Sequence, residues 1–129
     1  MTARSRTTGP SPYEIAYGFS RAVRVGDPIL ISGTAPVEPD GSSTPGDAAA
    51  QARRCFTIIL TAIEELGGTA ADVVRTRMYI TDPADADAVG AVHGELFGDV
   101  RPAATMVVVA ALLRDEWRVE IEAEALLAR

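Results

Sequence analysis

The chain has 129 residues and a formal net charge of −6 at pH 7, which is the size of one domain that folds around its own core without disulfides or metals. Its negative charge repels a phosphate backbone, and no cluster of basic residues offsets this repulsion, so we expect no nucleic-acid partner. The longest apolar run, residues 106–113, is far shorter than the roughly 20 residues that cross a bilayer, and residues 1–12 contain no apolar signal segment. We therefore expect a cytoplasmic protein with no membrane partner.

Several residue types that carry catalysis or hold cofactors are absent. All 12 basic residues are arginine, so the chain has no lysine for Schiff-base chemistry or for a phosphate-binding P-loop. Cys55 and His93 are the only residues of their types, which excludes an internal disulfide and a zinc site built on paired histidines. No glycine-rich dinucleotide motif occurs either. We predict no metal and no cofactor, and a chemistry limited to carboxylates, hydroxyls, main-chain amides and arginine.

The first part of the chain predicts a disordered lead-in followed by a hairpin. Residues 1–12 are rich in Thr, Ser, Arg, Gly and Pro without hydrophobic periodicity, so they are predicted to be a disordered N-terminal tail, and a single domain is expected over residues 13–129. Residues 21–25 alternate weakly between apolar and polar, and an apolar run at 29–31 follows a Gly-Asp-Pro turn. This pattern predicts two strands joined as a β-hairpin.

Two helices and a strand are predicted in the middle of the chain. The capping sequence TPGD is followed by apolar residues at helical spacing over residues 48–66 and then by two glycines, as at the start and end of an amphipathic helix. Residues 73–81 alternate with the period of a strand. A second helix is predicted over residues 82–97, because it begins with Asp-Pro and ends before a glycine.

The last third of the chain predicts two strands, at residues 106–113 and 117–127, on either side of a turn at 114–116. The resulting order, ββαβαββ, predicts an α/β (α+β) two-layer sandwich in which two helices cover one face of a mixed sheet. The run MVVVAALL has no polar side, and a strand of this kind is ordinarily buried on both faces. Two helices cover only one face, so the other face of this strand must meet something else. Another copy of the protein is the simplest candidate, and we expect a homo-oligomer.

Five stretches of the chain resemble the Rid/YjgF family, whose members are often labelled endoribonuclease L-PSP or translation inhibitor. They are AVRVGDPILISG (22–33), QARRCFTIILTAIEELGG (51–68), DVVRTRMYITD (72–82), RPAATMVVV (101–109) and VEIEAEAL (119–126). The resemblance begins near Phe19, covers nearly all of the chain from there and is specific in order and spacing. It implies a chorismate-mutase-like fold, a homotrimer, and small-molecule sites in the clefts between subunits. The best-known members hydrolyse reactive imines and enamines, made from amino acids, to keto acids and ammonia.

The resemblance also implies a site. Glu120 matches a glutamate that points into the cleft between subunits and holds or activates the water that attacks the imine carbon. A carboxylate suits this work because it accepts a hydrogen bond from water and orients it near its target. Glu122 and Glu124 share its side of the strand, where they flank the cleft or face water. The residues matched to the rest of the site are Phe19, Ser32, Gly33, Gly90, Ala104 and Thr105.

Three of these positions depart from the family pattern. Ala104 stands where deaminating members carry an arginine that clamps the substrate carboxylate, Phe19 where many members carry a tyrosine, and Gly90 where many carry an asparagine. A charge-assisted pair contributes about 1.5–3 kcal/mol, so its absence predicts a roughly ten- to hundredfold weaker grip on a carboxylate substrate. We therefore expect a divergent subgroup that lacks the deaminase arginine and has an altered substrate preference.

Three further side chains are candidates for a part in the site. Arg77 lies in the middle of a predicted strand, where it either faces water or a partner or takes the place of the missing arginine, and Arg101 is a second candidate for that replacement. His93 is on the second helix and carries the one side chain whose unperturbed pKa lies near neutrality, which suits a proton shuttle. The alternative for His93 is a hydrogen-bonded histidine at the edge of the core.

These observations leave three functions open. The first is an enzyme that adds water to a small imine, enamine or related carbonyl–nitrogen compound, with Glu120 holding the water and Ser32, Gly33 and Thr105 lining the pocket. The second is a trimer that binds a small metabolite without converting it, which the three departures from the family pattern favour. The third is a ribonuclease, as the family label says; it ranks last because the chain is acidic, has no lysine and has one histidine.

Overall fold

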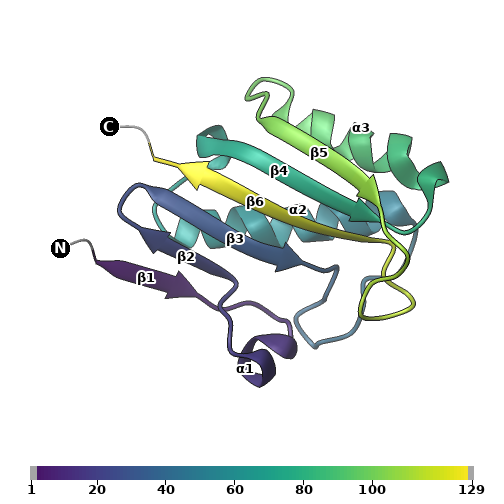
Figure 1. Cartoon of the computed structure of the whole chain (residues 1–129), viewed down its shortest axis with the longest axis horizontal. Coiled ribbons are helices and arrows are strands. Elements are labelled where there is room, and N and C mark those ends of the chain that lie inside the picture. The colour runs from purple at the N-terminus through teal and green to yellow at the C-terminus, as the bar shows by residue number, and fades with distance from the viewer. Residues whose placement is uncertain (1–2, 128–129) are drawn as a thin grey trace.

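The computed structural model describes residues 3–127, which form a six-stranded mixed sheet with α2 and α3 behind it (Figure 1). In chain order the elements are β1 (Arg4–Thr7), α1 (Tyr13–Tyr17), β2 (Ala22–Val25), β3 (Pro28–Thr34), α2 (Ala48–Glu65), η1 (Ala70–Asp72), β4 (Val73–Ile80), η2 (Pro83–Asp85), α3 (Ala86–Phe97), β5 (Ala103–Val108) and β6 (Val119–Leu126). The strand order across the sheet is β1-β2-β3-β6-β4-β5. The β4–β5 pair is parallel and the other pairs are antiparallel. The predicted α/β class, a mixed sheet with helices on one face, is confirmed.

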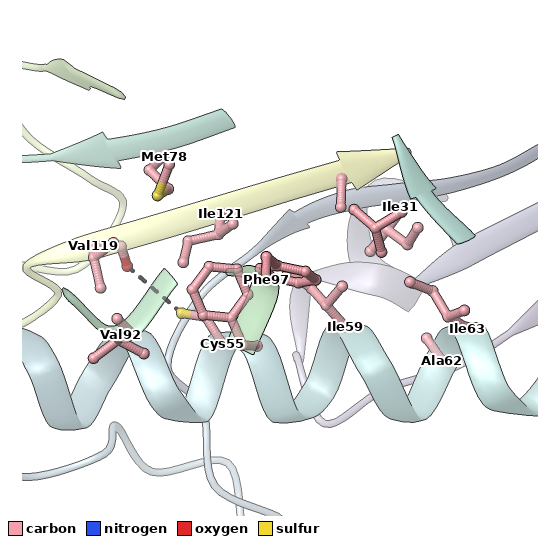
Figure 2. Close-up of a cluster of buried hydrophobic side chains, with 14 of the residues drawn as sticks. Ile31, Cys55, Ile59, Ala62, Ile63, Met78, Val92, Phe97, Val119 and Ile121 are labelled. Atoms are coloured by element: carbon pink, nitrogen blue, oxygen red, sulfur yellow. Dashed lines mark hydrogen bonds between the residues drawn. The ribbon is translucent and has the colours of Figure 1, made fainter. Parts of the chain in front are cut away.

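The longest helix, α2, follows from its local sequence. Asp47 caps its N-terminus by accepting a hydrogen bond from the Ala50 amide at 2.9 Å. The chain leaves the helix through Gly67, whose φ of 95° is the left-handed conformation that glycine adopts without strain. The apolar stripe of α2, which includes Cys55 and Ile59, faces the sheet in the main core (Figure 2). Burying such side chains contributes roughly 1.5–3 kcal/mol each for the larger ones, so the stripe holds α2 against the sheet.

Cys55 belongs to this core. Its side chain is fully buried, and its Sγ lies 4.0 Å from the main-chain carbonyl oxygen of Val119 (Figure 2). Burial raises the pKa of the Cys55 thiol, which keeps it protonated and therefore unreactive as a nucleophile.

The strands β4 and β6 place their side chains alternately on the two faces of the sheet. In β6 the odd-numbered residues 119–125 are buried beneath the helices, and the glutamates at 120, 122 and 124 point to the opposite face. The register of β4 with β6 puts Arg77 and Tyr79 on the same side as these glutamates. Within the described chain no helix covers this side, which we call the uncovered face. No helix found in residues 3–127 is long and apolar enough to cross a membrane.

The prediction of a disordered tail over residues 1–12 is wrong for the part that the structure describes. Strand β1 pairs with β2 in antiparallel register, from Arg4 opposite Val25 to Thr7 opposite Ala22, and helix α1 follows it. This segment is held by main-chain hydrogen bonds, which any residue can form. Its sequence therefore needs no hydrophobic periodicity, and the sequence pattern does not predict the strand. The predicted order ββαβαββ therefore lacks one strand and one short helix at its start. Met1 and Thr2 lie outside the described residues.

The predicted bounds of the last two strands are also corrected. Strand β5 covers Ala103–Val108 rather than residues 106–113, and β6 starts at Val119 rather than at 117. The segment between β5 and β6 lies outside the sheet. Its residues Leu112 and Trp117 pack with Val37 in a second, smaller core. The expected burial of the MVVVAALL run on both faces does not occur within one chain, since β5 is an edge strand and Val107 is 41% exposed.

Candidate functional site

A pocket of about 340 Å³ opens where the ends of β3 and β6 meet α1. Its lining includes the side chains or backbone of Phe19, Arg21, Ser32, Gly33, Trp117 and Glu120. We call it the Glu120 pocket. A wider hollow of about 850 Å³ lies beside it, between α1 and β1, and shares Phe19 with it. Among the described residues that line this hollow there is no glutamate of β6.

Strand parity and one glycine position the Glu120 carboxylate. Glu120 is on the uncovered face of β6, opposite Tyr79 of β4, and is partly buried. A Cβ atom built on Gly33 would lie 2.8 Å from the Glu120 Oε2 atom, so the carboxylate can lie against the β3 backbone only because residue 33 has no side chain. Burial raises the pKa of Glu120; the positive charge of Arg21 opposes this rise, and the negative charge of Glu122 adds to it. A carboxylate with a raised pKa is a stronger acceptor of a proton from water.

A buried ion pair lies beneath the pocket. The Arg21 and Glu14 side chains are only 3% and 5% exposed, with 3.8 Å between Arg21 Nη1 and Glu14 Oε2. Arg21 Nη2 also donates to the Gly33 carbonyl at 2.9 Å, and Glu14 Oε1 accepts from the Gly9 amide at 2.9 Å. Burial lowers the pKa of the Arg21 guanidinium, while the charges of Glu14 and Glu120 oppose this effect. Arg21 therefore connects α1, the Gly33 backbone and the charge on Glu120.

Ser32 and Gly33 lie at a β-bulge rather than at a simple turn. The register of β3 with β6 shifts between Ile31 and Thr34, which is the irregularity expected of a bulge. The Ser32 hydroxyl donates to the Ser20 carbonyl at 2.7 Å, so it holds the chain that enters β2 against β3. Gly33, within this irregular stretch, lines the Glu120 pocket.

Aromatic side chains form one wall of the pocket. The Tyr13 and Tyr17 rings stack with centroids 5.1 Å apart, and Tyr13 meets Trp117 edge to face at 6.2 Å. The Arg21 guanidinium lies 5.5 Å from the centroid of Phe19. The guanidinium of Arg114 lies over Trp117 and Tyr13, at 5.3 and 5.9 Å from their centroids. The wall is therefore built by α1 and the loop before β6 together.

The other residues predicted for the site lie elsewhere in the single chain. Ala104 and Thr105 are on β5, opposite Thr76 and Arg77 of β4, and β5 is two strands away from β6. Gly90 is on α3, behind the sheet; a Cβ there would lie 4.0 Å from Met106 Cε. One chain thus gathers Phe19, Ser32, Gly33 and Glu120, and does not gather Gly90, Ala104, Thr105, Arg77 and His93.

His93 and Arg77 each have a partner within the chain. His93 Nε2 lies 2.8 Å from Thr76 Oγ1, and the imidazole packs against Phe56 and Phe97. Burial lowers the pKa of His93, which favours the neutral ring at pH 7. Arg77 pairs with Glu124 at 3.2 Å on the uncovered face. His93 is thus a hydrogen-bonded histidine on the face of the sheet opposite to Glu120.

Sequence reasoning did not identify Arg21 or the aromatic wall as parts of the site. Arg21 precedes a weakly alternating segment, where a charged residue is usually exposed, and nothing in the sequence pairs it with Glu14. The sequence does not single out Tyr79 either. Tyr79 donates a hydrogen bond to Glu122 on the uncovered face, and this bond is the main cause of the raised pKa of Tyr79. Among residues 3–127, no group of three His, Cys, Asp or Glu side chains is arranged to hold a metal ion.

The sequence profile of the Endoribonuclease L-PSP family matches residues 11–127. The chain belongs to this family. A crystal structure of Rv2704 from Mycobacterium tuberculosis, described as a member of the YjgF/YER057c/UK114 family, superposes with a TM-score of 0.87 and 42% identity, over 97% of this chain and all of that one. Among L-PSP relatives, the 2-iminobutanoate/2-iminopropanoate deaminase of Escherichia coli is 33% identical over 86% of this chain and 87% of its own length. An uncharacterised protein of Streptomyces coelicolor is 38% identical over 93% and 90%. The resemblance to the Rid/YjgF family is confirmed.

Proposed function

We propose that this L-PSP family protein is an imine or enamine hydrolase that works as a homotrimer, with the Glu120 pocket in the cleft between subunits. The observation that carries the proposal is the Glu120 carboxylate, partly buried against Gly33 and with a raised pKa, in a pocket of a size suited to a small molecule. The E. coli relative with a deaminase name supports the reaction class. A cytoplasmic location stays a prediction from the sequence.

The reaction needs one water and one carboxylate. Glu120 accepts a hydrogen bond from water and takes its proton as the water oxygen bonds to the carbon of the protonated imine, which gives a carbinolamine. Glu120 returns this proton to the nitrogen. The carbon–nitrogen bond then breaks as the hydroxyl group gives its proton to Glu120, which passes it to the departing ammonia, so the products are a carbonyl compound and an ammonium ion. No electrons are exchanged, so no redox partner is required. Burial of Glu120 strengthens its basicity, and Gly33 leaves room for the carboxylate.

Assembly of three chains supplies what a single chain lacks. The uncovered face carries apolar side chains that are half exposed, Leu30 at 53%, Val25 at 44% and Val107 at 41%, and apolar surface of this kind favours burial against another copy. We propose that the β5 residues Ala104 and Thr105 of one subunit approach the Glu120 pocket of its neighbour. With alanine at position 104, the cleft receives no arginine from that position, so the substrate preference differs from that of amino-acid-derived imines.

The proposal is tested by ammonia release from imines made in situ by an amine or amino-acid oxidase, measured above the background of spontaneous hydrolysis. Glu120→Gln should lower kcat/KM about 10²- to 10⁴-fold, because the amide cannot take the proton from water. Glu124→Gln is the matched control, since Glu124 lies on the same strand and face but pairs with Arg77; it should keep most of the activity. Undiminished turnover in Glu120→Gln would show that another group handles the water.

A second candidate is a trimer that binds a metabolite without converting it. The observation in its favour is that Arg21, the cation in the pocket lining, is already engaged by Gly33 and Glu14, and Ala104 supplies none. A compound that raises the Tm and is recovered chemically unchanged, with no acceleration of any imine, would favour this function. Ribonuclease activity ranks last because the net charge of −6 opposes RNA binding.

A further inference from the structure

The aromatic residues of this chain are unevenly placed. The sequence contains three Tyr, three Phe and one Trp, and four of these seven, Tyr13, Tyr17, Phe19 and Trp117, line the Glu120 pocket. Tyr17 is 67% exposed and Phe19 is 37% exposed, so part of their ring surface is open to a bound molecule. Flat apolar walls of this kind bind flat apolar groups, and they bind cations over their faces.

The charges around the pocket do not suit a carboxylate ligand. Arg21 is the one cation among the described lining residues, and its side chain is 3% exposed. Its Nη2 is bonded to the Gly33 carbonyl and its Nη1 faces Glu14. When ionised, the carboxylates of Glu14 and Glu120 and this one guanidinium have a net charge of −1. Arg114, whose guanidinium lies over Trp117 and Tyr13, is not among the lining residues, and its Nη1 donates to the Gly41 carbonyl at 3.1 Å. Within the described lining, a ligand carboxylate would therefore meet the Glu120 carboxylate and no free cation, whereas a positively charged nitrogen would be attracted to Glu120.

We propose that the substrate of the Glu120 pocket is the protonated imine of a primary amine that carries an aromatic side chain and no carboxylate. This inference rests on the proposed hydrolase function and narrows its substrate class. The iminium nitrogen lies toward Glu120, and the aromatic ring lies against Phe19 and Tyr17. Water adds to the carbon of R–CH=NH2⁺, the carbon–nitrogen bond breaks, and an aldehyde and NH4⁺ leave. A pocket of about 340 Å³ is at the lower end of the roughly 300–1,000 Å³ of small-molecule sites, which suits one ring on a short chain.

Four imines that differ in two features test this inference. Phenylethylamine and ethylamine, oxidised by an amine oxidase, give imines without a carboxylate; phenylalanine and alanine, oxidised by an amino-acid oxidase, give imines with one. We expect the phenylethylamine imine to have a kcat/KM at least tenfold above that of the phenylalanine imine, and also above that of the ethylamine imine. A preference for either carboxylate-bearing imine would overturn the inference and leave the hydrolase function standing. Acceleration of none of the four would overturn both.

A pair of variants on α1 gives a second readout. Tyr17 and Ile15 are both exposed on this helix, at 67% and 96%, but only Tyr17 lines the Glu120 pocket. Tyr17→Ala should lower kcat/KM for the phenylethylamine imine about threefold to tenfold, and for the ethylamine imine by less, because only the former presents a ring to stack. Ile15→Ala should change neither. Equal losses for both imines in Tyr17→Ala would show that the wall does not select an aromatic group.

Discussion

At the scale of single residues, the site depends on a close approach that only glycine permits. The Glu120 Oε2 atom would lie 2.8 Å from a Cβ at position 33, closer than carbon and oxygen atoms pack. The atom that would have to move is the end of a flexible side chain, so the carboxylate and not the backbone would yield. The consequence is that stability and activity should respond differently to a side chain at this position.

Gly33→Ala should therefore fold with a Tm close to that of the native chain and lose activity. A displacement of the carboxylate by about 1 Å is expected to lower kcat/KM roughly ten- to hundredfold. Gly94→Ala is the control, because a Cβ on Gly94 of α3 would contact nothing within 4 Å; it should keep its activity and gain roughly 0.5–1 kcal/mol in the free energy of unfolding. If Gly33→Ala keeps full activity, Glu120 does not act from the position seen in the structure.

Glu120 should also cost stability at neutral pH. Burial raises its pKa in the folded protein, against the opposing charge of Arg21. A raised folded-state pKa stabilises the protein below the unfolded pKa, near 4.3, and this stabilisation is lost as the pH rises through the folded pKa. Glu120→Gln should thus have a higher Tm than the native chain at pH 7, with no difference below about pH 4. Thermal melts from pH 3.5 to 8 measure this, and a lower Tm for Glu120→Gln at pH 7 would contradict it.

At the scale of elements, the sequence predicts those that carry their own local signals. Helix α2 has a capping aspartate, an apolar stripe and a left-handed glycine after it. Strand β4 alternates between the two faces from Arg75 to Ile80, after a register shift between Val73 and Arg75. Strand β1 and helix α1 have no such signals, since they depend on pairing with β2 and on the buried Glu14–Arg21 contact. The family resemblance, rather than a local signal, predicts Glu120 as a site residue, whereas the role of Arg21 depends on tertiary contacts that the sequence does not reveal.

The attachment of α1 should depend on the Glu14–Arg21 pair. Because both side chains are almost fully buried, Glu14→Gln leaves the Arg21 charge without its counterion and should lower the free energy of unfolding by about 3 kcal/mol, measured by urea denaturation. Adding Arg21→Met should recover part of that loss. Arg53→Met, which breaks the exposed Arg53–Glu95 pair, should cost less than about 1 kcal/mol. A loss in Glu14→Gln no larger than in Arg53→Met would show that the buried pair does not hold α1.

At the scale of the whole molecule, the two faces of the sheet differ in what covers them. Helices α2 and α3 lie behind one face (Figure 1). On the other face, Val107 of the edge strand β5 and Leu30 of β3 are about half exposed. Two of the β6 glutamates on this face have partners there, since Arg77 donates to Glu124 and Tyr79 donates to Glu122. A surface that combines open apolar side chains with paired polar ones suits contact with another copy of the chain.

A charge on this surface should separate the proposed trimer. Leu30→Glu adds a carboxylate opposite Glu124, which an exposed strand tolerates but a buried interface does not. Light scattering should change from three times the chain mass of 13.6 kDa to that mass itself, with an unchanged circular dichroism spectrum. Leu96→Glu, at a 37% exposed position on α3 behind the sheet, should keep the native mass.

The separated chain retains its Glu120 pocket but loses the neighbour's β5, so it should lose imine hydrolysis as well. A native chain that is already monomeric would contradict the proposed trimer, and a Leu30→Glu variant that keeps a trimeric mass would place the interface elsewhere.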